Sequence, residues 1–329
     1  MAVPSLVSRL KLPVLLGLAI PAWQPALAQQ LAPLPPGAEA RSLLGQLLVP
    51  PALPAATRQT YEQRLAEAQQ AYQRTPNNPD SLIWLGRRTA YLGRYREAIV
   101  IFGEGIEKHP RDARMYRHRG HRFITVRELA RAIADFERAD SLVRGKPDEV
   151  EPDGIPNALG TPTSTLHSNI RYHLGLAYYL QGNFAKAVEL YTRDVAAARA
   201  AGNADMLVAS SHWLYMALRR SGQAAEAARV LEPITRELSV IENGSYHRLL
   251  LMYKGLLAAD SVLPRKPDGE TDFGTVEGVT VGYGVANWHL YNGRAEQAAA
   301  MFARILESPQ WAAFGFLAAE AEVARKRQQ

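Results

Sequence analysis

Residues 81–110 read SLIWLGRRTAYLGRYREAIVIFGEGIEKHP, and a pattern within them recurs along the chain. Three residue types return at a spacing of 34, namely Gly86 and Gly120, Ala98 and Ala132, and Phe102 and Phe136. A third copy begins at Leu174-Gly175, and two weaker copies contain Gly222 and Gly293. A fixed period of this length indicates an array of similar units, each too small to bury its apolar face alone.

The recurring residues have physical roles in a unit made of two packed helices. Small residues such as Gly86 and Ala98 leave room where two helices cross closely, and Phe102 fills the space between units. Gly93 falls where the first helix must end, since glycine tolerates the left-handed conformation that follows the last helical turn. These residues resemble the tetratricopeptide repeat, a helix–turn–helix unit of this length.

The resemblance implies an all-α fold, a right-handed superhelical solenoid of helix–turn–helix repeats. We expect repeats near residues 79–112, 113–142, 168–200, 208–240 and 279–310, with a degenerate pair near 245–275. The surplus spacing between copies predicts two long inserted loops, at 146–168 and 263–275, both containing proline and glycine. Helices at 61–72 and 310–325 are expected to cap the array, which spans residues 57–329.

The N-terminal residues 1–28 have the features of a secretory signal peptide. Arg9 and Lys11 precede a short apolar run, and Ala26-Leu27-Ala28 forms a cleavage site. We therefore expect cleavage after Ala28 and export to the bacterial periplasm or medium, with an uncleaved anchor as the alternative. The apolar run is shorter than the ~20 residues of a membrane-spanning helix. Residues 29–56 are expected to form an Ala/Pro-rich tether that could include a short helix at 40–48.

Composition and motifs narrow the classes of function. The chain has 329 residues, a formal net charge of +6 and no cysteine, which excludes disulfides, thiolate metal sites and cysteine nucleophiles. No nucleophile elbow, Walker A or dinucleotide motif is present. Arginines surround His118 and His121 and would repel a dication. We therefore expect no catalysis, no cofactor and no metal site, and export argues against a nucleic-acid partner.

Proteins with this repeat use the first helix of each pair to line a concave groove that binds a peptide or another protein. Carried over residue by residue, the groove positions here are Arg87, Tyr91, Arg117, His121, Tyr172, Tyr179, His212, Arg219, Tyr283 and Asn287. Arginine can hold a carboxylate through paired hydrogen bonds, and tyrosine offers a rigid amphipathic surface. Such a groove suits an extended acidic peptide. An anionic envelope polymer or glycan is the alternative ligand, and packing between helices is the alternative role of the tyrosines.

Two further segments are open to a functional and a structural interpretation. Residues 111–131 are the most basic, and Arg114, His118 and Arg122 share one helical side, which is either an anion-binding face or a solvated surface. The loop at 151–165 is longer than a repeat connection needs and could cover the groove as a lid. Its hydrogen-bonding groups would be Asp153, Asn157, Thr161 and Ser164. A plain surface loop is the alternative, and a hydrolase that uses Glu151 or Asp153 is the least favoured function.

Overall fold

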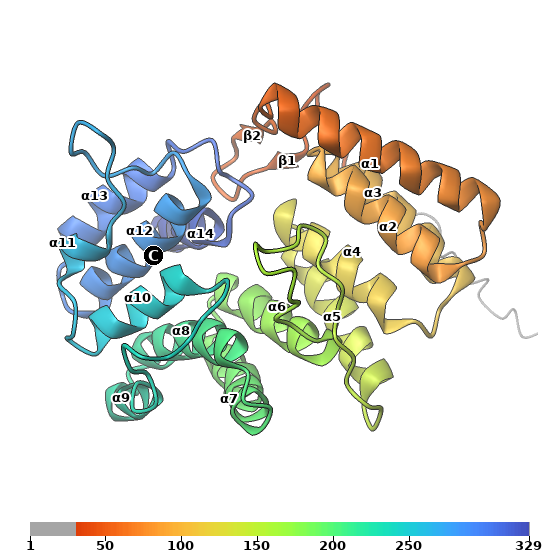
Figure 1. Cartoon of the computed structure of the whole chain (residues 1–329). Coiled ribbons are helices and arrows are strands. Elements are labelled where there is room, and N and C mark those ends of the chain that lie inside the picture. Colours follow the sequence, from red (N-terminus) through yellow and green to blue (C-terminus); the bar gives the residue numbers. More distant parts are fainter. Residues whose placement is uncertain (1–30, 329) are drawn as a thin grey trace, which may run out of the picture. The chain divides into compact units, whose positions relative to one another are not determined.

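The computed structural model describes residues 31–328, so the expected signal peptide lies outside the described residues. The chain divides at Pro33, and the unit that begins there contains every described helix and strand. Figure 1 shows that this unit is built almost entirely from helices.

Helix pairs joined by short turns follow one another through the unit, which confirms the all-α repeat fold. The pairs are α2 and α3 (Pro79–Tyr91, Tyr95–Lys108), α4 and α5 (Ala113–Thr125, Leu129–Val143), α6 and α7 (Leu166–Leu180, Phe184–Ala200), α8 and α9 (Ala204–Arg220, Ala224–Val230), and α12 and α13 (Val276–Tyr291, Ala295–Ile305). Helices α10 (Gly244–Tyr253) and α11 (Ala259–Val262) lie between the last two pairs. Helix α1 (Ala55–Arg74) precedes the array and α14 (Phe314–Gln328) follows it.

The first helices of the pairs form one layer and the second helices form the other. Helix α2 contacts α4, α4 contacts α6, α6 contacts α8, and α8 contacts α12, whereas α3, α5 and α7 each pack between two successive first helices (Figure 1). Residues at equivalent positions of successive repeats therefore lie side by side on the first-helix layer. This arrangement brings Arg87 of α2 near Arg117 and His121 of α4.

The recurring glycines mark places where an aromatic ring of the second helix presses on the first. A Cβ atom added to Gly86 would lie 2.5 Å from the Phe102 ring, and one added to Gly175 would lie 2.8 Å from the Tyr191 ring. Gly120 has the same relation to Phe136, at 2.9 Å. The recurring glycine and aromatic residues therefore reflect one packing contact, which is repeated in each of these helix pairs.

The substitution Gly175→Val should lower the free energy of unfolding by about 1–3 kcal/mol, because the added side chain would collide with Tyr191 in a packed core. Gly244→Ala is the matched control, since nothing lies within 4 Å of a Cβ atom at that helical glycine. Urea unfolding of both variants tests the prediction. Equal stability of Gly175→Val and the parent protein would contradict it.

The segment before α1 contains a small antiparallel hairpin, so residues 40–48 do not form the short helix that the sequence allows. Strands β1 (Ala40–Arg41) and β2 (Leu47–Leu48) pair with Ala40 opposite Leu48. The Trp311 indole donates a hydrogen bond of 2.7 Å to the carbonyl oxygen of Val49, just after the hairpin. Residues near the start of the unit are thus bonded to the segment that leads into α14.

Helix α14 packs against α12 and α13, and also against α6 of the first-helix layer. Two of its carboxylates, those of Glu320 and Glu322, are buried. Glu320 pairs with Arg127 at 2.7 Å, and both side chains are almost fully buried. Glu322 pairs with Arg220 and, at 2.5 Å, with Arg325. The C-terminal helix is therefore bonded to the first-helix layer as well as to the last repeat.

Arg127 occupies the position equivalent to Gly93, 34 residues later. Its φ of 67° is left-handed, which no other described residue except glycine adopts. Its guanidinium bonds Glu320, the carbonyl oxygen of Trp311 at 2.9 Å and that of Thr125 at 2.6 Å. An arginine tolerates this backbone conformation here because its side chain is bonded to the C-terminal segment.

Candidate functional site

A cluster of cationic and aromatic side chains lies between α2 and α4. Arg87 and His121 occupy equivalent positions in successive repeats, and Arg117 precedes His121 by one helical turn. Together with Tyr91, His118 and Arg122 these residues line a cavity of about 140 Å³, which we call the inner cavity. None of the described residues that line it is acidic.

Residues 149–154, between α5 and α6, lie against this cluster. Arg87 donates a hydrogen bond of 2.9 Å to the carbonyl oxygen of Pro152, and Arg88 donates one of 2.8 Å to that of Gly154. The base of the segment is closed by backbone bonds from Glu151 to Ser164 (3.1 Å) and from Leu166 to Glu149 (2.8 Å). The segment is therefore bonded both to α2 and to the residues at the start of α6.

Glu151 is the buried centre of this contact. Its carboxylate lies 3.1 Å from Nε of Arg117 and 3.3 Å from Nε2 of His118, and it accepts a hydrogen bond of 2.8 Å from the Asn169 amide. A guanidinium can only donate, so the 2.9 Å contact between Arg117 and Nδ1 of His118 places the ring proton on Nε2, which faces Glu151. The predicted groove residue Arg117 of α4 thus already holds an acidic side chain of the chain itself, together with Asn169 of α6.

The cluster carries more positive charge than its neighbours neutralise. Burial, together with Arg117 and Arg87, lowers the pKa of His118 well below its usual value, and burial with Arg122 does the same to His121. Burial also lowers the pKa of Arg122 to about 10. Arg122 lies 5.6 Å over the Tyr95 ring and pairs with no carboxylate among residues 31–328. The histidines are therefore neutral at pH 7, and the excess charge lies on the arginines.

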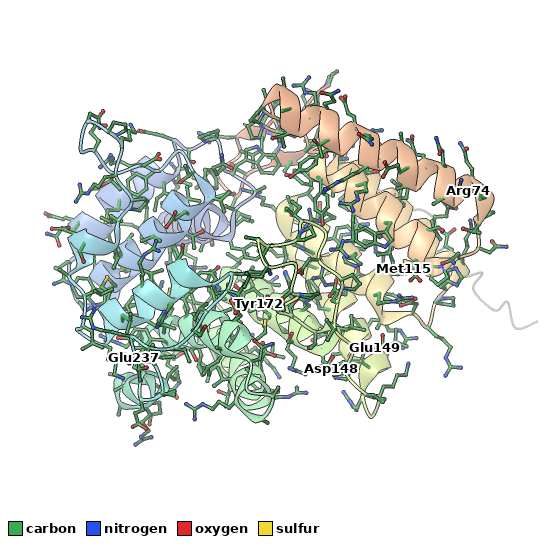
Figure 2. All side chains as sticks on the ribbon, in the orientation of Figure 1. Arg74, Met115, Asp148, Glu149, Tyr172 and Glu237 are labelled. Carbon is green, nitrogen blue, oxygen red and sulfur yellow. The ribbon has the colours of Figure 1, made fainter. Side chains whose placement is uncertain are left out.

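The predicted groove residues of the later repeats are packed inside the protein. Tyr172 lies in the interior, among side chains of neighbouring helices (Figure 2). Its hydroxyl accepts a 2.8 Å hydrogen bond from Trp213 of α8 and contacts the Tyr246 hydroxyl of α10. The Tyr179 hydroxyl contacts that of Tyr283 at 2.6 Å and accepts a 3.0 Å bond from Asn287. These four groove residues and His212 are all buried. These side chains therefore pack between helices and present no exposed surface to a partner.

Arg219 differs from these buried neighbours because its side chain is only partly buried. Its guanidinium lies 4.4 Å over the Tyr291 ring and donates a 3.0 Å hydrogen bond to Asn292. It therefore connects α8 to the end of α12, away from the inner cavity.

The polar residues of the 151–165 loop hold its shape. The Asn157 side chain accepts bonds from the backbone of Leu159 and Thr161 and donates a 2.6 Å bond to Glu242. The Ser164 hydroxyl accepts a 2.9 Å bond from Asn169. Asp153 is only partly buried, and burial together with Glu242 raises the pKa of its carboxyl. These contacts tie the loop to α6 and to the segment before α10.

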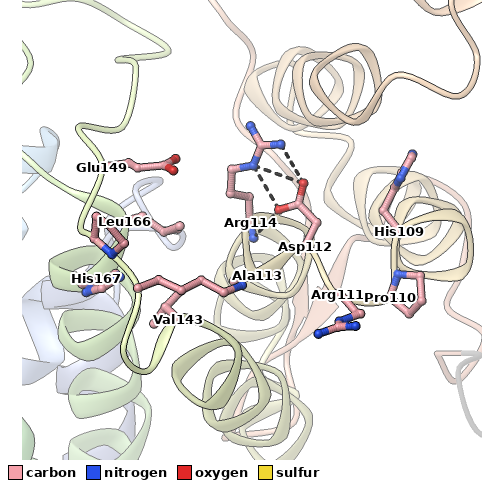
Figure 3. Close-up of a pocket in the computed structure, with 12 residues that line it drawn as sticks. His109, Pro110, Arg111, Asp112, Ala113, Arg114, Val143, Glu149, Leu166 and His167 are labelled. Atoms are coloured by element: carbon pink, nitrogen blue, oxygen red, sulfur yellow. Dashed lines mark hydrogen bonds and ion pairs between the residues drawn. The ribbon is translucent and has the colours of Figure 1, made fainter.

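Two larger cavities lie near the inner cavity, and one of them shares lining residues with it. An outer groove of about 660 Å³ lies between the α3–α4 turn and the start of α6, with Asp112 and Arg114 facing Glu149 and Leu166 across it (Figure 3). A middle cavity of about 260 Å³ shares Arg114 with the outer groove and shares Arg87 and His118 with the inner cavity. The middle cavity therefore lies between the other two, and residues 149–152 line it.

Metal-binding clusters and membrane-spanning helices were searched for in the described part of the chain. Among residues 31–328 there is no group of three or more histidine, aspartate or glutamate side chains that could hold a metal ion. No described helix is both long and apolar enough to cross a membrane.

Sequence reasoning named most of the cationic cluster but not all of its neighbours. The sequence places Arg122 only on a basic helical side and offers Glu151 only as a catalytic candidate, whereas His118 enters both that helical side and the rejected metal pair with His121. Asn169 and Phe314 were missed. The Phe314 ring lies 5.6 Å from that of His121, although the two residues are almost 200 positions apart, and no local pattern signals such a contact.

The known proteins that resemble this chain are solved structures of low sequence identity. No protein-family model and no curated protein matches the chain. Among solved structures, a tetratricopeptide repeat protein from Parabacteroides merdae has 15% identity and a TM-score of 0.43, with 80% of this chain and 99% of that one covered. YrrB, a repeat protein with an unusual peptide-binding site, has 14% identity and a TM-score of 0.40, covering 79% and 97%. PilW, a type IV pilus biogenesis factor, has 17% identity and a TM-score of 0.42, covering 76% and 86%. The repeat fold itself follows from the helix pairs and recurring contacts described above.

Proposed function

We propose that this chain is a non-catalytic scaffold of the cell envelope that binds an extended acidic segment of a partner protein along α2, α4 and α6. One observation carries the proposal, namely that the chain's own residues 149–154 occupy this face. Glu151 is held there by Arg117 and Asn169, while Arg87 bonds the neighbouring backbone. A partner segment of similar chemistry would use the same donors after replacing the loop.

The loop has properties of a replaceable occupant. Three apolar side chains between residues 150 and 159, namely Val150, Ile155 and Leu159, are exposed to solvent, so this stretch buries little apolar surface of its own. Its attachment depends mainly on hydrogen bonds and the Glu151 ion pair. A tethered segment nevertheless competes at an effective concentration that reaches the millimolar range. A partner would therefore need contacts beyond one carboxylate, for which the outer groove provides room.

A peptide of residues 148–155, Asp-Glu-Val-Glu-Pro-Asp-Gly-Ile, is a suitable probe because it copies the natural occupant. The host is a variant in which Asn-Gly replaces residues 152–163 and Glu151→Gln removes the competing carboxylate. The backbone bond between Glu151 and Ser164 places the chain ends for such a two-residue turn. We expect the peptide to bind this host at least about tenfold more tightly than it binds the parent protein, because the competing carboxylate of Glu151 and the tethered residues 152–154 are gone.

Adding Arg117→Gln to the host should weaken peptide binding by about ten- to a hundredfold, since a charge-assisted contact contributes roughly 1.5–3 kcal/mol. Arg229→Gln is the control, because Arg229 is an exposed arginine of α9. Fluorescence anisotropy measures binding, and thermal unfolding checks that each variant is folded. Equal affinity with and without Arg117 would contradict the proposed site.

A further inference from the structure

The inner cavity has the composition of a site for a small anion. Three arginines, Arg87, Arg117 and Arg122, line it together with Tyr91 and two histidines. Its volume of about 140 Å³ is roughly ten times the ~10–15 Å³ that one water molecule needs. The cavity is therefore large enough for a polyatomic anion but small for a peptide segment.

The carboxylates closest to the cluster do not line the cavity. Glu151 pairs with Arg117, and Asp153 is close enough to Arg87 for their charges to interact. Both belong to the loop and are absent from the cavity wall. No carboxylate pairs with Arg122 within residues 31–328. Partly buried positive charge without a counter-charge is unfavourable, so an anion bound beside Arg122 would be stabilising.

Hydrogen-bond donors in the cavity also remain unused. The side chains of Arg122 and His121 make no hydrogen bond in the described part of the chain, although each lines the cavity. Both side chains lie against aromatic rings, Arg122 over Tyr95 and His121 against His173 at 4.5 Å. Donors of α2 and α4 reach the same space from two helices. A carboxylate offers two oxygens at one edge, whereas the four oxygens of phosphate or sulfate accept hydrogen bonds from several directions.

We propose that the inner cavity binds a phosphate-type oxyanion between α2 and α4, with Arg122 as its main anchor and Arg87 and Arg117 as further donors. The ligand is free phosphate or sulfate, or the phosphate group of a small ester that enters through the adjoining middle cavity. The proposal does not depend on peptide binding, because the partner segment would occupy the loop position outside this cavity.

Titration calorimetry with the purified mature protein tests the proposal, using phosphate, sulfate, glycerol phosphate and acetate at equal ionic strength. We expect saturable one-site binding of phosphate or sulfate and at least about tenfold weaker binding of acetate. Phosphate should also raise the melting temperature as its concentration rises, since it binds only the folded state. Glycerol phosphate that binds as tightly as phosphate identifies an ester site, and its failure to bind identifies a free-anion site.

The variant Arg122→Gln is expected to behave differently from the parent protein in the absence and in the presence of phosphate. In buffer without oxyanions it should melt at or above the temperature of the parent protein, because the uncompensated charge is removed. With phosphate it should show no calorimetric binding and no increase in melting temperature. Arg87→Gln is a second variant that should weaken binding, and Arg229→Gln should leave binding intact. The proposal is overturned if phosphate has no effect beyond that of chloride, or if its effect persists unchanged in Arg122→Gln and Arg87→Gln.

Discussion

Glu320→Leu is expected to lower the free energy of unfolding by about 3–5 kcal/mol, because it leaves the buried guanidinium of Arg127 without its carboxylate. The same carboxylate accepts the backbone N–H of Leu43. One substitution therefore removes contacts from the N-terminal hairpin and from the turn between α4 and α5. Urea unfolding measured by circular dichroism would give the change.

Two further variants make this result specific. Glu189→Ala removes an exposed partner of Lys186 and should change stability by less than about 1 kcal/mol. Arg127→Gly combined with Glu320→Leu should recover part of the loss, since glycine suits the left-handed backbone and no unpaired charge remains. If Glu320→Leu is no more destabilising than Glu189→Ala, the buried pair does not hold α14 in place.

Acidification from pH 7 to pH 5 is expected to destabilise the fold by several kcal/mol. Burial lowers the pKa of four histidines, His118, His121, His173 and His212, and the pKa of the last two falls to about 3. Below about pH 6.5 the unfolded chain takes up protons that the folded protein excludes. Each such histidine therefore reduces the free energy of unfolding by up to about 1.4 kcal/mol per pH unit as the pH falls.

The pH window follows from these shifts. Stability should begin to fall near pH 6.5 and continue to fall toward pH 3, where His173 and His212 themselves become protonated in the folded state. Burial raises the pKa of the Asp135 and Asp194 carboxyls, which acts in the opposite direction at the acid end. The range from pH 6.5 to 5 therefore isolates the histidines best.

His212→Phe tests the contribution of one histidine. Burial is the only cause of its lowered pKa, and its ring stacks on Tyr246 at 4.5 Å, a contact that an aromatic phenylalanine ring can also make. Relative to the parent protein, the variant should gain about 2 kcal/mol of stability between pH 6.5 and pH 5. Chemical denaturation at several pH values gives the comparison. Parallel pH profiles of the two proteins would contradict the assignment.

The repeat fold could be predicted because its determining contacts are close in sequence. Gly86 and Phe102, or Gly175 and Tyr191, are 16 residues apart and meet within one helix pair, so the period appears directly in the sequence. The positions of Arg87, Arg117 and His121 followed from the same register. This register places residues on a helix face but does not say what covers that face.

The rest of the site depends on contacts between distant segments. The ion pair between Arg127 and Glu320 joins residues 193 positions apart, and Phe314 reaches His121 over a similar separation. Such pairs leave no periodic trace in one sequence. One local signal did exist, since Arg127 stands where the preceding repeat has Gly93. A large charged residue at a left-handed position needs a compensating contact, and here the C-terminal segment supplies it.

The most direct test of the proposed function is whether an acidic peptide displaces residues 149–154 from α2, α4 and α6. The chain has no cysteine, so Ile155→Cys and Val100→Cys would carry the only two spin labels, at exposed positions on the loop and on α3. The distance between the labels should lengthen as the 148–155 peptide is added, and it should stay unchanged in the Arg117→Gln background. Saturable binding of the peptide with an unchanged distance in the otherwise unaltered protein would contradict the account.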